Sequence, residues 1–92
     1  MTDEAVHHVY MLKCQDDTFY VGYTTDIVRR LREHNTSSKG AKYTRGRRPV
    51  KLVYYTTFTT KSAALKHEHV LRKQPRKEKE RLTQTFEGKL NF

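Results

Sequence analysis

Aromatic, aliphatic and polar positions alternate at the start of the chain and predict a β-hairpin. Residues 7–14 (HHVYMLKC) and 19–23 (FYVGY) are rich in strand formers, and residues 15–18 (QDDT) are typical of a turn. Because side chains alternate along a strand, a loop with an odd number of residues places Tyr10 and Tyr20 on the same face. A two-residue loop at Asp16 and Asp17 places them on opposite faces. The pattern leaves both alternatives open.

A first helix is predicted from about residue 26 to about residue 35. Two threonines and Asp26 precede it, and such side chains accept hydrogen bonds from the free amides of a helix start. Ile27 and Leu31 are four residues apart and are expected to face the core. Arg30 and His34 have the same spacing and share another stripe of the helix.

The remaining chain is predicted to contain one strand and two helices. Residues 36–49 have no period and are expected to form a basic, structureless loop, with Tyr43 available to stack. Residues 50–58 predict the third strand, and a second helix begins at about residues 59–62 and ends near Lys73. Pro75 separates it from a short basic helix over residues 76–85. We therefore expect one domain over residues 1–92, in the order β-β-α-β-α-α, with short tails.

The charge of the chain points to a polyanionic partner. Nineteen Lys and Arg residues stand against ten Asp and Glu residues, which gives a net charge of +9 on only 92 residues. This excess does not distinguish a nuclease from an RNA-binding protein. The side chains that we expect to contact nucleic acid are Lys39, Lys42, Tyr43, Arg45, Arg47, Arg48, Arg72 and Lys73.

Cysteine usage and hydropathy bear on location. Cys14 is the only cysteine, so no intramolecular disulfide can form and a reducing compartment is expected. No apolar run approaches the roughly 20 residues of a membrane span, and the acidic first residues do not look like a signal peptide. We expect a cytoplasmic protein, or a nuclear one if its source has a nucleus.

One carboxylate lies at an unexpected place in the second predicted helix. Ala64, Leu65 and Leu71 mark the apolar stripe, and Glu68 is four residues after the first and three before the last. A carboxylate facing a core is unfavourable unless a cation meets it. Glu68 is therefore either an edge residue paired with Arg72 or a metal ligand at the rim of a cleft, and the two interpretations weigh equally.

The hairpin resembles the GIY-YIG nuclease superfamily, which is named for two triplets on adjacent strands. Here the triplets are residues 8–10 (HVY) and 20–22 (YVG), so the first retains only its tyrosine. The residues that follow strengthen the resemblance: Tyr23, Thr24, Asp26, Ile27, Arg29, Arg30, Leu31 and His34. The similarity covers residues 7–83 and is greatest to small stand-alone bacterial members, whose cellular roles are mostly unassigned.

The resemblance implies a fold, a cofactor and a site. The fold is a three-stranded antiparallel sheet flanked by helices, an α+β architecture. The cofactor is one divalent cation, Mg²⁺ or Mn²⁺, held by Glu68. Active-site roles are implied for Tyr10, Tyr20, Arg30, His34 and Glu68.

These residue types suit phosphodiester cleavage. A metal ion and an arginine stabilise negative charge on phosphate oxygens, so Arg30 is expected to contact the scissile phosphate. One tyrosine, with Tyr20 preferred, would orient or deprotonate the attacking water, which requires nearby cations because tyrosine has a pKa near 10. Tyr23 stands where some relatives have a lysine, so the identity of the base stays open.

Two functions follow from the resemblance and the charge. The first is a metal-dependent endonuclease acting on DNA, including branched, flapped or single-stranded forms, with a role in DNA repair by family association. The second is a catalytically weak module that binds DNA or RNA through the same basic cleft. DNA is preferred over RNA as the partner. We see no targeting domain, so specificity is expected to be low or to come from a protein partner.

Overall fold

The computed structural model describes residues 6–86 and is built around one three-stranded sheet. Its elements in chain order are β1 (His7–Lys13), β2 (Phe19–Thr24), α1 (Ile27–Thr36), α2 (Lys42–Arg45), β3 (Lys51–Phe58), α3 (Lys61–Arg72) and α4 (Arg76–Thr85). The sheet is antiparallel with the order β2-β1-β3. The predicted α+β fold is therefore confirmed, with one additional short helix.

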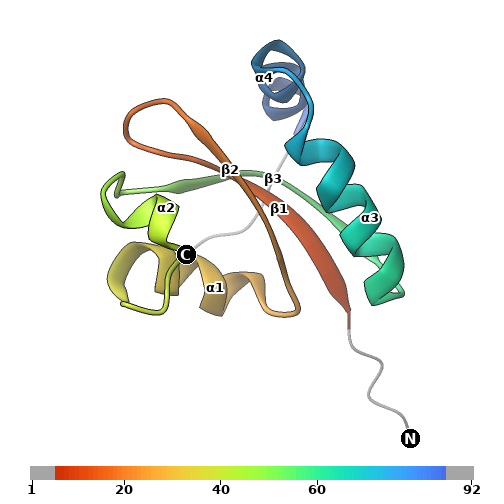
Figure 1. Ribbon diagram of the computed structural model, residues 1–92, viewed down its shortest axis with the longest axis horizontal. Coiled ribbons are helices and arrows are strands. Elements are labelled where there is room, and N and C mark those ends of the chain that lie inside the picture. The colour runs from red at the N-terminus through yellow and green to blue at the C-terminus, as the bar shows by residue number, and fades with distance from the viewer. Residues whose placement is uncertain (1–5, 87–92) are drawn as a thin grey trace, which may run out of the picture.

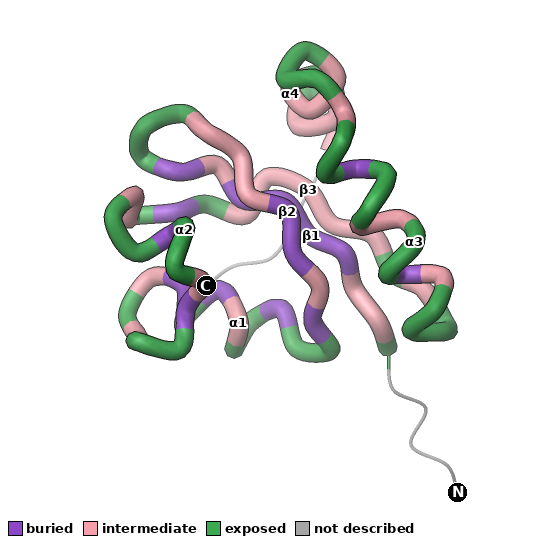
Figure 2. Tube along the Cα trace, viewed as in Figure 1, coloured by how far each residue is buried: buried purple, intermediate pink, exposed green. Residues whose placement is uncertain are grey.

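Helices cover both faces of the sheet, as Figure 1 shows. Helices α1 and α2 lie on one side, and α3 packs on the other against β1 and β2. The central strand β1 is the most enclosed, since residues 9–12 are all buried (Figure 2). Strand β2 forms one edge of the sheet, so side chains from both faces can meet around it.

The hairpin loop settles which tyrosines share a face. It comprises the five residues 14–18, an odd number, and the register pairs Tyr10 with Gly22 and Leu12 with Tyr20. The Asp16 carboxylate accepts hydrogen bonds from the Thr18 amide and hydroxyl, and Asp17 has a positive φ of 68°. The odd-loop alternative is therefore correct, and both tyrosines project from the same face.

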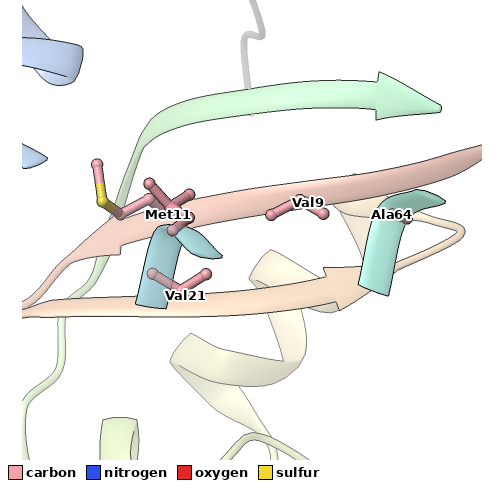
Figure 3. Packing of buried hydrophobic residues seen from close by; sticks show 5 residues of the cluster. Val9, Met11, Val21 and Ala64 are labelled. Carbon is pink, nitrogen blue, oxygen red and sulfur yellow. The ribbon is translucent and has the colours of Figure 1, made fainter. Parts of the chain in front are cut away.

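Each face of the sheet has its own apolar core. The face toward α3 buries Val9, Met11, Val21, Ala64 and Leu71 (Figure 3). The face toward α1 buries Tyr10, Leu12, Cys14, Leu31 and Val50. The even-numbered residues of β1 thus serve one core and the odd-numbered residues the other, as strand geometry requires.

The segment 36–49 is not structureless, contrary to the expectation from its sequence. Helix α2 occupies residues 42–45 and buries Thr44 completely. A single helical turn is too short to display a hydrophobic period, and here hydrogen bonds to α1 hold it in place. The expected loop is therefore a folded cover over the end of α1.

Leu65 does not belong to the buried stripe of α3, contrary to the prediction from the sequence. Ala64 and Leu71 are buried, whereas Leu65 is 40% exposed. At about 100° per residue, positions seven apart nearly coincide around a helix, and a neighbour of either points well away. The buried stripe is therefore narrower than predicted, and the apolar side chain of Leu65 faces outward.

The expectations for the acidic N-terminus, residues 1–4, and for a tail after residue 86 lie outside the described residues. Within residues 6–86, no helix combines the length and the apolar composition needed to cross a bilayer.

Candidate active site

Tyr10 lies directly over the backbone of Gly22 on the neighbouring strand. A Cβ atom at Gly22 would overlap with the ring and hydroxyl of Tyr10, so only glycine allows this approach. Tyr10 is 2% exposed. The pairing of the first triplet's tyrosine with the second triplet's glycine thus directs the Tyr10 hydroxyl toward α1.

His34 meets that hydroxyl from α1. Its Nε2 lies 2.7 Å from Tyr10 Oη, and its ring is fully buried. On the other side of the ring, Nδ1 lies 3.1 Å from Thr44 Oγ1 and accepts the Ala41 amide hydrogen at 3.3 Å. Because a backbone amide can only donate, Nδ1 is unprotonated, and the proton of the neutral ring is on Nε2 and directed at Tyr10.

Helix α1 also supplies Arg30, one turn before His34. The helix begins at the Asp26 N-cap, whose carboxylate accepts the Arg29 amide hydrogen at 3.0 Å. Arg30 Nη1 donates to Glu33 Oε1 at 2.9 Å and to the Lys39 carbonyl at 2.8 Å. Two acceptors therefore fix the Arg30 side chain, which remains about one-quarter exposed.

The C-terminal end of α1 is closed by residues from the following segment. Arg48 donates to the carbonyls of His34 and Ser37, both at 2.6 Å, and so satisfies groups that the last helical turn leaves free. Gly40 packs against the backbone of Glu33 and His34, where a Cβ atom would lie 2.8 Å from His34 Cα. His34 is thereby held from both its backbone and its ring.

Tyr20 completes the aromatic group around His34. Its ring centroid lies 6.4 Å from that of Tyr10 and 5.3 Å from that of His34. Tyr43 of α2 stacks on Tyr20 at 5.9 Å, and the guanidinium of Arg47 lies 4.0 Å from the centre of the Tyr43 ring. Tyr43 thus packs on Tyr20 within the protein, and Arg47 covers Tyr43.

Glu68 reaches the same region from α3, on the opposite face of the sheet. Its side chain is 16% exposed, and its Oε2 lies 2.5 Å from Arg72 Nη2. Arg72 Nη2 also lies 3.4 Å from the Val21 carbonyl of edge strand β2. The first interpretation of Glu68 required an ion pair with Arg72, and this pair is present. It does not exclude the second interpretation, in which Glu68 is a metal ligand.

The electrostatics of the site tie these side chains together. Burial is the main cause that raises the pKa of Tyr10, and the nearby Tyr20 and Glu68 raise it further. The guanidinium of Arg30 lies beside the Tyr10 hydroxyl and opposes this rise. Burial, followed by the positive charge of Arg30, lowers the pKa of His34 to about 4. At neutral pH the Tyr10 hydroxyl is therefore protonated and His34 is neutral.

The donor set at Glu68 fits a hydrated divalent cation better than a metal cage. Among residues 6–86, no three His, Cys, Asp or Glu side chains gather as a closed metal site would need. Mg²⁺ requires less, because it keeps several waters and binds through one or two carboxylates together with substrate phosphates. A guanidinium already lies 2.5 Å from the Glu68 carboxylate, so this position accommodates positive charge.

The lysines and arginines expected to contact nucleic acid divide into two groups. Arg47 donates to Asp16 and to the Tyr43 carbonyl, Arg48 donates to carbonyls of α1, and Arg72 pairs with Glu68. The exposed side chains of Lys39, Lys42, Arg45 and Lys73 make no hydrogen bond or ion pair within residues 6–86. The second group is free to meet phosphates, whereas the first is already engaged in the fold.

Comparison with known proteins identifies the family. Residues 6–81 match the GIY-YIG catalytic domain. The chain belongs to the GIY-YIG family. A UPF0213 protein of Haloquadratum walsbyi is 51% identical over 78 residues, which cover 85% of this chain and 86% of that protein. A UPF0213 protein of Staphylococcus epidermidis is 49% identical over 78 residues and covers 85% and 94%. The relatives are thus archaeal as well as bacterial.

Solved structures agree with the GIY-YIG assignment. The solution structure of a protein from E. faecalis is 45% identical, covers 100% of this chain and 97% of that one, and superposes with a TM-score of 0.61. The UPF0213 protein of Bacillus halodurans is 44% identical, covers 91% and 88%, and gives a TM-score of 0.57. The fold of this GIY-YIG chain is therefore shared with two experimentally determined structures.

Two contributors to the GIY-YIG site were not predicted from the sequence. Thr44 holds the ring of His34, and Arg48 holds its backbone. The only sequence signal for Thr44 is its place in the basic segment that follows α1, and a lone threonine there shows no periodicity. Arg48 was expected to contact nucleic acid because of its charge, which does not reveal that carbonyls of α1 surround it.

Proposed function

We propose that the protein is a divalent-metal-dependent endonuclease that hydrolyses phosphodiester bonds in DNA. The observation that carries the proposal is the arrangement of Tyr10, Tyr20, Arg30 and His34 in one cluster, with Glu68 within electrostatic range of Tyr10. Helices from opposite faces of the sheet contribute to this group. Packing alone does not require that two tyrosines, an arginine, a histidine and a carboxylate converge.

The roles follow from charge and position. Glu68 would hold Mg²⁺ or Mn²⁺, which when bound supplies positive charge that stabilises the phosphate oxygens. Arg30, held by Glu33 and the Lys39 carbonyl, would contact the scissile phosphate with its guanidinium. Both groups act where negative charge develops during attack on phosphorus.

The general base requires donors around its oxygen, and these gather at Tyr10. The sequence favoured Tyr20 for this role, but His34 Nε2 and Arg30 lie beside the Tyr10 hydroxyl. Among the described residues, the Tyr20 hydroxyl makes no hydrogen bond. We assign the role of general base to Tyr10 Oη: once its own proton has left to solvent, the tyrosinate would accept the proton of the attacking water, with Tyr20 and His34 positioning the group. The raised pKa of Tyr10 in the free protein means that ionisation depends on the charges of the loaded site.

Binding and location complete the proposal. Lys39, Lys42, Arg45 and Lys73 are exposed and supply phosphate contacts, with DNA preferred over RNA as the substrate. Structured or single-stranded DNA, a DNA-repair setting and a protein partner that supplies specificity belong to the same proposal. A cytoplasmic location is consistent with a single cysteine that lies buried in the core.

The alternative is a binding module with negligible turnover. The engagement of Glu68 by Arg72 favours it, because this ion pair occupies a carboxylate oxygen that the metal would need. The two functions differ only in cleavage, so affinity measurements alone do not separate them.

Cleavage assays separate the two functions. Purified protein is incubated with labelled linear, flapped, branched and single-stranded DNA, and with single-stranded RNA, in Mg²⁺, Mn²⁺ or EDTA. We expect metal-dependent products that disappear with Glu68→Gln and persist with Glu80→Gln, which removes the same kind of carboxylate from an ion pair on α4. Tight binding without products on any substrate would replace the nuclease with the binding module.

A second pair of variants tests the assignment of the base. Tyr10→Phe removes the hydroxyl bonded to His34, and we expect a rate at least about 100-fold lower with little change in DNA affinity. Tyr20→Phe removes a hydroxyl without a partner and should lower the rate less. The reverse order of effects would return the role to Tyr20.

A further inference from the structure

Arg72 covers the carboxylate that is expected to bind metal. Its guanidinium lies 2.5 Å from Glu68 Oε2, and its side chain is 59% exposed whereas that of Glu68 is only 16% exposed. The cation is therefore the outer member of the pair. A metal ion that takes Glu68 Oε2 as a ligand would therefore displace Arg72 from that oxygen.

Arg72 also lies against edge strand β2, which carries Tyr20 of the candidate site. Its Nη2 lies 3.4 Å from the Val21 carbonyl, on the edge strand that carries Tyr20 and Gly22. A guanidinium forms two parallel hydrogen bonds to a phosphate as readily as to a carboxylate. A phosphate arriving at this edge would therefore compete with Glu68 for Arg72.

The Arg72–Glu68 pair is suited to exchange rather than to permanent locking. Arg72 is open to solvent, so water and salt screen its i,i+4 pair with Glu68, and the freedom that both side chains lose keeps the net gain in stability small. The weak pair nevertheless neutralises a half-buried carboxylate that would otherwise lack a partner in the described part of the chain. Releasing Arg72 is easy once another anion takes its place.

We propose that Arg72 is an exchangeable counter-ion for Glu68, which neutralises the carboxylate in the free protein and transfers to a substrate phosphate as the metal binds. This inference rests on the proposed metal role of Glu68. It makes metal binding and nucleic-acid binding mutually dependent through one side chain. The dependence is reciprocal, since each partner removes the competitor of the other.

Metal affinity without nucleic acid is the first test, measured as free Mn²⁺ by electron paramagnetic resonance. Arg72→Gln should bind Mn²⁺ about twofold to fivefold more tightly than the wild type, as expected for loss of an exposed ion pair. Arg72→Lys keeps the charge and should stay near the wild type. Lys66→Gln removes a charge from the same helix without touching Glu68 and should also change nothing. Equal affinities for Arg72→Gln and the wild type would overturn the inference.

Glu68→Gln separates this inference from the proposed function. If Glu68→Gln still binds Mn²⁺ as the wild type does, the metal site itself is wrong and both proposals fail. If it loses Mn²⁺ binding while Arg72→Gln matches the wild type, the metal site stands and the exchange role of Arg72 is refuted. Circular dichroism checks that each variant is folded.

DNA affinity in EDTA is the second test, because cleavage cannot occur there. Glu68→Gln frees Arg72 and should tighten binding of a labelled 20-nucleotide single-stranded DNA more than Glu80→Gln, which removes an equal charge on α4. In the Arg72→Gln background, Glu68→Gln should tighten DNA binding by no more than Glu80→Gln does. An equal gain from Glu68→Gln in both backgrounds would show that Arg72 does not transfer to phosphate.

Discussion

At the scale of single residues, the candidate site depends on one close contact between strands. Tyr10 lies where the side chain of residue 22 would otherwise be, and the space comes from the missing Cβ of Gly22. This contact directs the tyrosine hydroxyl at His34 and Arg30. Tyr10, the tyrosine of the first triplet, can therefore occupy its place only because the last residue of the second triplet is glycine, Gly22.

Gly22→Ala should displace Tyr10 and break its hydrogen bond to His34. We expect a loss of about 1–3 kcal/mol in the free energy of unfolding, as for overpacking of a core, together with strongly reduced cleavage. The control is Gly46→Ala, because nothing lies within 4 Å of a Cβ at that position. Urea denaturation compares the two variants, and equal stabilities would contradict the steric argument.

His34 should make stability depend on pH in the acidic range. Its pKa is lowered to about 4 in the folded protein, against about 6.5 unfolded. Between these values the unfolded chain binds the additional proton, so this contribution is fully present above about pH 6.5 and is lost as the pH falls toward 4. His8 and His67 shift in the same direction and add to the loss.

His34→Gln isolates the contribution of that residue. The variant retains hydrogen-bonding capacity but cannot titrate, whereas His8 and His67 remain in both proteins. Urea denaturation from pH 7 to pH 4.5 should show a smaller loss of stability in the variant than in the wild type. Parallel curves would mean that folding does not lower the pKa of His34.

At the scale of elements, α2 is the least expected part of the fold and the one most involved in holding the site. Its four residues fully bury Thr44, whose Oγ1 lies 3.1 Å from His34 Nδ1 and 2.8 Å from the Ala41 carbonyl oxygen, so its single hydroxyl proton serves one of these two acceptors at a time. Tyr43 from the same turn stacks on Tyr20. The helix thus contacts both the histidine and the outer tyrosine.

Thr44→Val tests this role while preserving the shape of the side chain. Loss of the hydroxyl should lower the free energy of unfolding by about 1–2 kcal/mol and reduce cleavage more than binding, because His34 loses support. Thr85→Val is the matched control, since within residues 6–86 its exposed hydroxyl bonds only to the Leu82 carbonyl on α4. Similar stability losses in both variants would argue against a specific role for α2.

Sequence patterns predicted the long elements and missed what depends on contacts between them. The hairpin, α1, β3, α3 and α4 have periods or capping residues that act locally, and they occur close to the predicted residues. The face shared by Tyr10 and Tyr20 depended on the length of one loop. Helix α2 and the engagement of Arg47 and Arg48 depend on tertiary partners, which charge and propensity do not reveal. The roles assigned to the five site residues remain predictions.

At the scale of the whole molecule, the site draws on both layers around the sheet. Glu68 comes from α3 on one face, and Arg30 and His34 come from α1 on the other. The net charge of +9 gives the molecule a positive field, which attracts polyanions without sequence preference. Of the cations near the site, Lys42 and Arg45 project from α2 without partners in the described residues.

The salt dependence of binding reports which cations meet phosphate. Affinity for DNA should fall steeply between about 50 and 200 mM salt, and the double variant Lys42→Gln/Arg45→Gln should flatten the slope of log K against log salt by up to about 2. Lys66→Gln/Lys77→Gln removes the same charge from α3 and α4 and should alter the slope less. Fluorescence anisotropy measures both, and equal slopes would show that α2 is not part of the interface.

The five-residue hairpin loop limits how related proteins can change in length. If a residue were inserted or deleted within residues 14–18 and the loop kept its five residues, the pairing of β1 with β2 would shift by one and turn Tyr20 to the face of α3. If the loop itself took up the change, Tyr20 would stay opposite Leu12 and keep its face. Members of the family with an intact site should therefore absorb changes of length in the loop, or carry a bulge that restores the alternation.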